Sequence, residues 1–418
     1  MAATIAADEL DFRDYVRPGD NLTWGQATAE PVTLTENLLR QRENLGGITC
    51  FIGITVADTV RPEHADHIRF VSYCGTGSNR ALMRAGALDI YPGHYSSLPG
   101  LLTRGALATD VVLVQCSPAD DQGRYSLGIA ADYYAAAIDS ARVVIAEVND
   151  QVPFTYGQRY LTAADVDVVV HSARPPVQQQ ATPIGAQVRQ VAAKAAELIE
   201  DGSTLQFGIG AVPEAVLAAL GDKRDLGIHS GVLNDVAADL IEHGVVTNAR
   251  KSVDRGVSVG GLLLGTRRLF DFAHRNPAVA VRPTSYTHDA NLLAAQHNLV
   301  AINSAIEVDL TGQVNAEVAG GTYVGAVGGG AEFLRGAARS RGGIPIVALP
   351  STASERSRIV AELSGPVSTS RADAGVFVTE YGVADLRGRT LAERQALMLT
   401  IAHPDHRKTL EEKLCGEP

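Results

Sequence analysis

Glycine-rich turns are the first features of this sequence that could bind a reactive group. In segment 204–216 an apolar run leads through Gly208 and Gly210 into a helical pattern over 213–220. Glycine lets backbone N–H groups come close to a ligand, and the N-terminus of a helix favours negative charge. The pattern therefore indicates an anion-binding turn. A plain tight turn is the alternative, because the third glycine of a dinucleotide fingerprint is absent.

A second candidate is the pair His229-Ser230, which precedes Gly231 and a helix expected to start near Asn234. Histidine is a common general base. A lone histidine is also an ordinary core or capping residue, and this segment reads equally as a strand-to-helix turn. Gly231 has no side chain, so it can supply neither a nucleophile nor a base.

A third candidate follows an alternating stretch. Apolar and polar side chains alternate over 306–310 before Thr311-Gly312, which predicts a β-hairpin. Asn315 and Glu317 come directly after it. They can line a pocket, or they can be the polar edge of the hairpin.

Two later segments carry a glycine run and a carboxylate. Gly328–Gly330 costs backbone entropy and is tolerable where a loop passes tightly against a ligand or another backbone. Arg335, on the helix predicted next, can meet a phosphate or lie on a solvated face. Glu380 follows the apolar run 376–378 and can line a site or cap the next helix.

The sequence predicts that these residues are positioned by strands that alternate with helices. Short β-branched runs predict buried strands at 111–114, 143–146, 300–302, 344–349 and 376–378. Helical patterns are predicted over 129–140, 184–200 and 213–220. This alternation predicts an α/β fold with mostly parallel sheets. The proline-rich stretch 174–183 predicts a linker between domains at 1–178 and 184–418, the second carrying most of the site.

Composition excludes several classes of function. The 418 residues carry a formal net charge of −11 without a basic stripe, so we expect no nucleic-acid partner. No apolar run reaches the ~20 residues that span a bilayer, and the N-terminus lacks a signal peptide, so a cytoplasmic protein is predicted. The four cysteines are scattered, and His403 and His406 flank a proline without a third ligand. We therefore expect no metal.

Taken in order, these segments resemble the acetyl-CoA hydrolase/CoA-transferase family, of the family-I type that includes 4-hydroxybutyrate and acetate CoA-transferases. The resemblance runs from Gly25 to His406 and is most specific from Gln206 to Gly388. It implies two CoA-transferase-like α/β domains with the active site in the interdomain cleft, and a homodimer or larger homo-oligomer. It also implies a CoA thioester as substrate, a small-molecule acceptor, and no covalently bound cofactor.

The resemblance assigns roles to individual residues. In that family a glutamate follows the His-Ser pair and attacks the thioester, and Gly231 stands at that position here. Oxyanion-stabilising amides are implied at Val212 and at Gly328 and Gly329, and His229 and Glu380 are candidate bases. The remaining residues expected to bind substrate or CoA are Gln206, Gly208, Gly210, Ser230, Asn315, Glu317, Gly330 and Arg335.

A site that keeps its oxyanion-stabilising loops but lacks the family's nucleophile is compatible with three functions. The favoured hypothesis is acyl transfer or thioester hydrolysis by direct attack of an acceptor on the bound thioester. The second is CoA transfer between carboxylates with Glu317 or Glu380 as the nucleophile. The third is an inactive acyl-CoA-binding protein.

Overall fold

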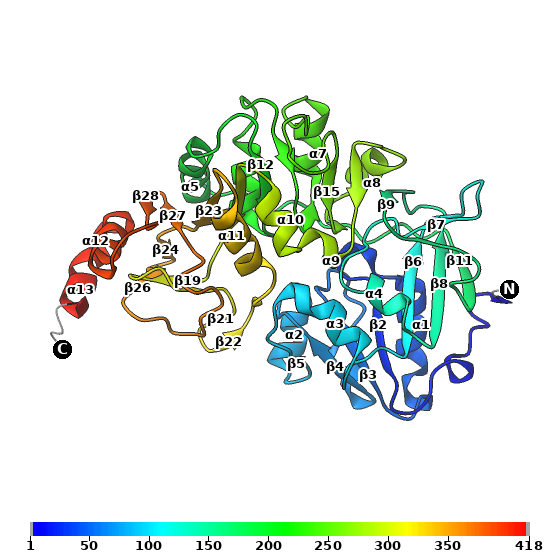
Figure 1. The fold of residues 1–418 in the computed structure, drawn as a ribbon. Helices are drawn as coiled ribbons and strands as arrows, with labels where there is room; N and C mark the ends of the chain where they lie inside the picture. The colour runs from blue at the N-terminus through cyan, green and yellow to red at the C-terminus, as the bar shows by residue number, and fades with distance from the viewer. Residues whose placement is uncertain (1–2, 415–418) are drawn as a thin grey trace. The chain divides into compact units, whose positions relative to one another are not determined.

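The computed structural model describes residues 3–414 and divides into two compact units (Figure 1). Within these residues, the first unit comprises 3–180, Gly231–Asp235 and Val259–Thr287, and the second comprises Ala181–Ser230, Val236–Ser258 and 288–414. The fold is α/β with mostly parallel sheets, as the alternation of strand and helix patterns predicts.

The first unit is built on an eight-stranded sheet of order β1-β11-β8-β6-β2-β3-β4-β5, in which every neighbouring pair is parallel. Its strands are β1 Ala3–Thr4, β2 Asn21–Trp24, β3 Ile48–Ile52, β4 Ile68–Ser72, β5 Asp89–Ile90, β6 Val111–Cys116, β8 Val143–Asn149 and β11 Val168–Ser172. Strands β6 and β8 are buried along their whole length, as parallel strands covered on both faces must be.

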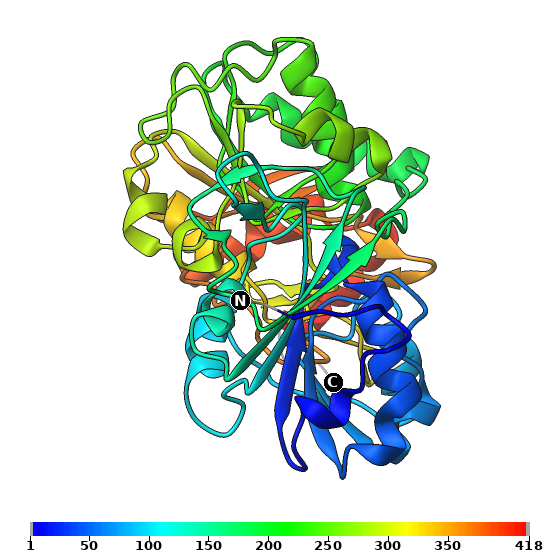
Figure 2. The same cartoon turned by 90° about the vertical axis from the view of Figure 1, so that its right-hand side faces the viewer.

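Short helices and strand pairs complete this unit. Leu34 and Leu38 of α1 join the core of the sheet, and Figure 2 shows the blue helices beside the strands. Segments far apart in sequence pair in it, since β9 pairs with β17 and β14 with β16, both in parallel. These elements are α1 Val32–Gln41, α2 Asn79–Arg84, α3 Leu98–Thr103, α4 Ala135–Ile138, α8 Arg267–Ala273, β9 Tyr156–Gly157, β14 Val232–Leu233, β16 Leu262–Leu263 and β17 Val279–Val281.

The second unit has a six-stranded sheet of order β13-β12-β18-β23-β27-β28. The first five strands are parallel, and β28 returns antiparallel to β27. Its strands are β12 Thr204–Phe207, β13 Gly227–Ile228, β18 Leu299–Asn303, β23 Ile344–Ala348, β27 Val376–Thr379 and β28 Gly382–Asp385. Its helices are α5 Ala186–Glu197, α6 Ala211–Ala218, α7 Asp235–Glu242, α10 Ala290–Ala295, α11 Gly330–Arg339, α12 Leu391–Ile401 and α13 Pro404–Leu414, and α11 packs on β18 and β23.

Most predicted elements are confirmed. Each of the five predicted strands is present, 174–183 has no regular structure, and the hairpin forms from β19 Glu307–Asp309 and β20 Val314–Asn315. The helix predicted over 129–140 is wrong, because only Ala135–Ile138 is helical. Ala130 instead bridges to Leu262.

Two findings concern the chain as a whole. None of the helices between residues 3 and 414 has both the length and the apolar character that crossing a bilayer requires. Cys50, Cys74 and Cys116 are buried free thiols, and burial raises their pKa, which keeps them protonated. Cys415 lies outside the described residues.

Candidate active site

Three predicted site residues of the second unit, Gly208, His229 and Glu380, lie at one edge of its sheet. Parallel strands end at the same edge, and open α/β sheets bind ligands outside the carboxyl ends of their strands. The residues that end or follow strands β13, β12, β18, β23 and β27 here are, in that order, His229, Gly208, Asn303, Ser351 and Glu380.

The first glycine turn opens helix α6. Gly210 precedes the helix with φ of +129°, a conformation that side chains disfavour, and Val212 is the second helical residue. The first four N–H groups of a helix have no acceptor within it. The amide of Val212 therefore belongs to a set of donors at a helix N-terminus, which suits an oxyanion. Ile209, between the two glycines, is 48% exposed.

The second glycine turn opens helix α11 in the same way. Gly328 has φ of +58°, Gly329 is the N-cap, and Gly330 is the first helical residue. Helix α11 is ten residues long, and its first four N–H groups have no acceptor within the helix. Each of the two glycine segments therefore leads directly into the N-terminus of a helix.

Asn303 joins the two turns. Its Nδ2 donates to Gln206 Oε1 at 3.0 Å. A Cβ added at Gly208 would lie 3.0 Å from Asn303 Oδ1, and one added at Gly330 would lie 3.6 Å from it. The Asn303 side chain therefore lies close to both turns. Sequence reasoning missed this role, although a polar residue that ends a buried strand was its signal.

His229 and Ser230 are both fully buried. The Ser230 hydroxyl donates to the Phe207 carbonyl at 3.2 Å, and the His229 amide donates to Leu205 at 3.0 Å. Both bonds hold the segment against β12. Just before it, Lys251 Nζ donates to the Ile228 carbonyl at 2.8 Å. The residue that follows this pinned segment is Gly231.

Glu380 has three hydrogen-bond donors around it. Ser351 Oγ donates to Oε1 at 2.5 Å, the Ser351 amide donates to Oε2 at 2.9 Å, and Gln187 donates to Oε1 at 2.8 Å. Partial burial acts to raise the pKa of Glu380, but these hydrogen bonds outweigh it and the pKa is lowered. The carboxylate is therefore ionised at neutral pH and fixed in orientation.

The side chains of Asn315 and Glu317 form hydrogen bonds with nearby residues of the chain. Glu317 accepts from Ser368 Oγ at 2.7 Å and from Tyr323 Oη at 3.0 Å. Asn315 donates to Glu307 Oε1 at 3.0 Å and is fully buried. Both side chains stabilise the turn that follows β20.

Arg335 lies on the exposed side of α11. Its guanidinium makes a forked ion pair with Asp373, with N–O distances of 2.9 and 2.7 Å. The side chain is 52% exposed and that of Asp373 is 15% exposed. The positive charge is thus largely balanced where it lies.

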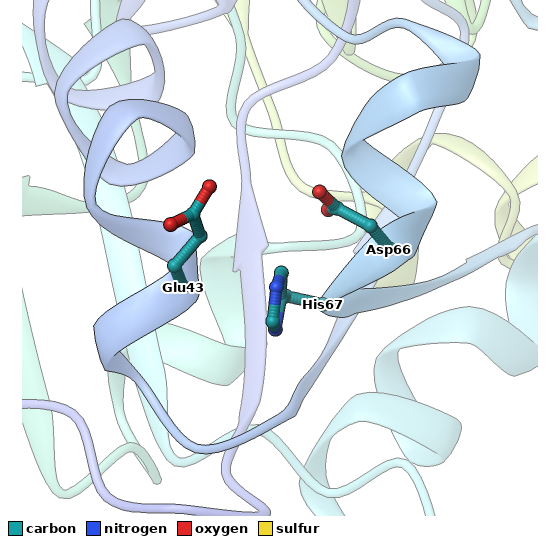
Figure 3. A group of neighbouring side chains, drawn as sticks. All are labelled: Glu43, Asp66 and His67. Atoms are coloured by element: carbon teal, nitrogen blue, oxygen red, sulfur yellow. The ribbon is translucent and has the colours of Figure 1, made fainter.

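One group of possible metal ligands occurs in the described part of the chain, in the first unit. Glu43, Asp66 and His67 bring ligand atoms within 4.8 Å of one another, and Figure 3 shows them projecting from neighbouring segments. All three are exposed, and Arg42 binds both oxygens of Asp66 at 2.8 and 2.9 Å. The arginine thus already pairs with one of the two carboxylates of this cluster.

Known proteins match this chain along most of its length. Models of the acetyl-CoA hydrolase/transferase N-terminal and C-terminal domains match residues 5–178 and 265–414. The chain is 36% identical over 395 residues to the 4-hydroxybutyrate coenzyme A transferase of Clostridium kluyveri, covering 93% of this chain and 92% of that protein.

Solved structures agree with the sequence comparisons. The crystal structure of RipA from Yersinia pestis matches with a TM-score of 0.93 at 33% identity, covering 100% of this chain and 98% of that one. The 4-hydroxybutyrate CoA-transferase from Porphyromonas gingivalis matches with a TM-score of 0.84 at 34% identity and the same coverage. The chain therefore belongs to the acetyl-CoA hydrolase/transferase family and is an enzyme of acyl-CoA transfer or hydrolysis.

Proposed function

We propose that this enzyme passes the acyl group of a CoA thioester directly to a small acceptor or to water, without a covalent glutamyl intermediate. The observation that carries the proposal is the glycine at position 231, where the family resemblance implies a nucleophilic glutamate. A residue without a side chain forms neither an acyl anhydride nor a glutamyl-CoA thioester. A homo-oligomer and a cytoplasmic location remain predictions.

In the proposed reaction the acceptor oxygen or nitrogen attacks the thioester carbonyl carbon. The carbonyl oxygen becomes an oxyanion, which the N–H groups at the starts of α6 and α11 stabilise, Val212 among them. Collapse breaks the C–S bond, and CoA leaves as a thiolate that takes up the proton lost by the acceptor. Acyl-transfer sites stripped of their nucleophile retain roughly 10³–10⁴-fold acceleration over water.

Glu380 is the better of the two candidate bases. Its side chain is partly exposed and ionised near neutral pH, whereas His229 is fully buried. A base must reach the proton it removes, directly or through one water. We therefore assign proton removal from the acceptor to Glu380, with Ser351 and Gln187 holding its orientation.

The second candidate function is CoA transfer between carboxylates. The relatives favour it, since the proteins of Clostridium kluyveri and Porphyromonas gingivalis carry that activity in their names. It requires Glu317 or Glu380 as the nucleophile. Glu317 is buried and both of its oxygens already accept hydrogen bonds, which weighs against it as the nucleophile. The hydrogen bonds to Glu380 lower its nucleophilicity and its basicity alike, so the acceptor assay must distinguish its two possible roles.

Acceptor dependence separates the two functions. The protein is incubated with several acyl-CoAs, and free CoA is measured with and without added carboxylates, amines and alcohols. Direct attack predicts CoA release to water, an amine or an alcohol with sequential kinetics. Release that requires a carboxylate, follows ping-pong kinetics and is abolished by Glu317→Gln or Glu380→Gln supports the transferase instead. Binding of acyl-CoA without turnover contradicts both.

A further inference from the structure

The Gly328–Gly330 loop lies against a buried histidine that the proposed reaction does not use. A Cβ added at Gly329 would stand 2.4 Å from His288 Nε2 and 2.8 Å from its Cδ2. Real Cβ atoms do not approach other heavy atoms so closely, so Gly329 and the imidazole ring occupy adjoining space without a gap.

The same ring packs on the helix that the loop opens. The ring centroids of His288 and Phe333 are 4.5 Å apart, with the planes inclined at 55°. Phe333 lies in the first turns of α11 and is 2% exposed. One imidazole thus contacts the loop on one side and the helix on the other, which fixes the loop relative to the helix N-terminus.

His288 acts through shape rather than charge. Burial first, and then the proximity of His229, lower the pKa of His288 to about 3. The ring is therefore neutral in the neutral pH range. His229 belongs to the segment that precedes Gly231, and its Nδ1 is 3.5 Å from Gln296 Nε2. The imidazoles of His288 and His229 thus lie near each other behind the carboxyl edge of this sheet.

We propose that His288 is a positioning residue of the acyl-transfer site, whose ring sets where the backbone of Gly328–Gly330 lies and so where the first N–H groups of α11 point. The inference rests on the proposed function, in which these groups stabilise the oxyanion. Catalytic geometry is sensitive to such support, since a displacement of about 1 Å costs up to roughly 100-fold in rate.

A pair of substitutions tests this contact. Gly329→Ala should lower kcat by roughly 10- to 100-fold with a smaller change in KM, because the new Cβ pushes the loop away from the His288 ring. His288→Ala alone should also lower kcat, since the loop loses its packing contact with the imidazole ring. The double variant should be at least about tenfold more active than Gly329→Ala, because the methyl group enters the space that the ring leaves.

Gly328→Ala is the matched control. Its φ is +58°, and only Ala326 Cβ, at 3.7 Å, lies within 4 Å of the added atom. The cost of this change is backbone strain rather than contact with the ring. His288→Ala should therefore not restore Gly328→Ala. Equal rescue of both glycine variants, or rescue of neither, overturns the proposal.

A second readout does not depend on turnover. His288→Asn is a milder variant that keeps a polar side chain, and hydrogen exchange of peptides covering 324–334 can be followed by mass spectrometry. Faster exchange in this variant supports the positioning role, and unchanged exchange contradicts it. If the wild type turns over no acyl-CoA, the proposed function fails while this comparison still decides the role of His288.

Discussion

The chemistry of this enzyme depends on which side chains are free to react. Gly231 contributes none, and Glu317 is enclosed by Ser368 and Tyr323. Glu380 is the exception, because it is ionised, partly exposed and held in one orientation by Ser351. At the scale of single residues, we therefore propose that Glu380 activates an acceptor and that no covalent acyl-enzyme forms.

Ser351→Ala tests the role of Glu380 through pH. The serine hydroxyl helps to keep the pKa of Glu380 low, so its loss raises that pKa. A base is inactive when protonated, so the acidic limb of kcat/KM should move to higher pH in the variant. Ser140→Ala is the control, because that hydroxyl bonds only the Ala137 carbonyl. An acidic limb that stays in place in Ser351→Ala shows that Glu380 is not the base.

At the scale of elements, the site is a row of strand ends closed by two helix N-termini. The sequence predicts strands β18, β23 and β27 and both glycine turns, because apolar runs and glycines are local signals. It does not predict that Asn303 lies between the turns or that His288 lies behind one of them. Those contacts depend on strand order and on helix packing, which no local pattern encodes. Helix α4 is shorter than its pattern for a related reason, since Ala130 pairs with a distant strand.

We expect the side chains of Asn303 and Gln206 to contribute to stability as a coupled pair, because they are hydrogen-bonded to each other. Asn303→Ala removes the hydrogen bond at 3.0 Å and leaves the buried amide of Gln206 without this partner. We expect a loss of about 1–3 kcal/mol in the free energy of unfolding and a fall in kcat. Urea unfolding of Asn303→Ala, Gln206→Ala and the double variant measures the coupling between the two side chains. Strict additivity of the two losses would show that the pair does not hold the turns together.

At the scale of the whole molecule, each unit is completed by segments distant in sequence. The first unit takes in Gly231–Asp235 and Val259–Thr287 far beyond the irregular stretch 174–183. Short parallel pairs such as β14 with β16 secure these segments. Two-residue strands carry too little periodicity to predict their partners, so the sequence indicates two halves but not this exchange of segments.

The buried Glu30 gives the first unit a pH-dependent stability. Burial raises the pKa of Glu30 to about 7, although Thr35 Oγ1 donates to it. Because this pKa lies above the unfolded value of about 4.3, the folded protein binds more protons between these values, and stability falls as pH rises through that window. Glu30→Gln removes this dependence.

Urea unfolding of the wild type and of Glu30→Gln at pH 5 and pH 8 measures the effect. Relative to the variant, the wild type should be more stable at pH 5 than at pH 8 by on the order of 2 kcal/mol in the free energy of unfolding. Other titrating groups are common to both proteins and cancel. A difference between the two proteins that is the same at both pH values contradicts the assignment.

Intact-protein mass spectrometry can detect the covalent step that we propose Gly231 eliminates. Wild-type protein and Gly231→Glu are incubated with an acyl-CoA and quenched in acid, and their masses are measured. We expect no adduct on the wild type, and on Gly231→Glu a mass increase of one CoA less one water, as a glutamyl-CoA thioester requires. A glutamyl-CoA adduct on the wild-type chain would overturn the proposed reaction.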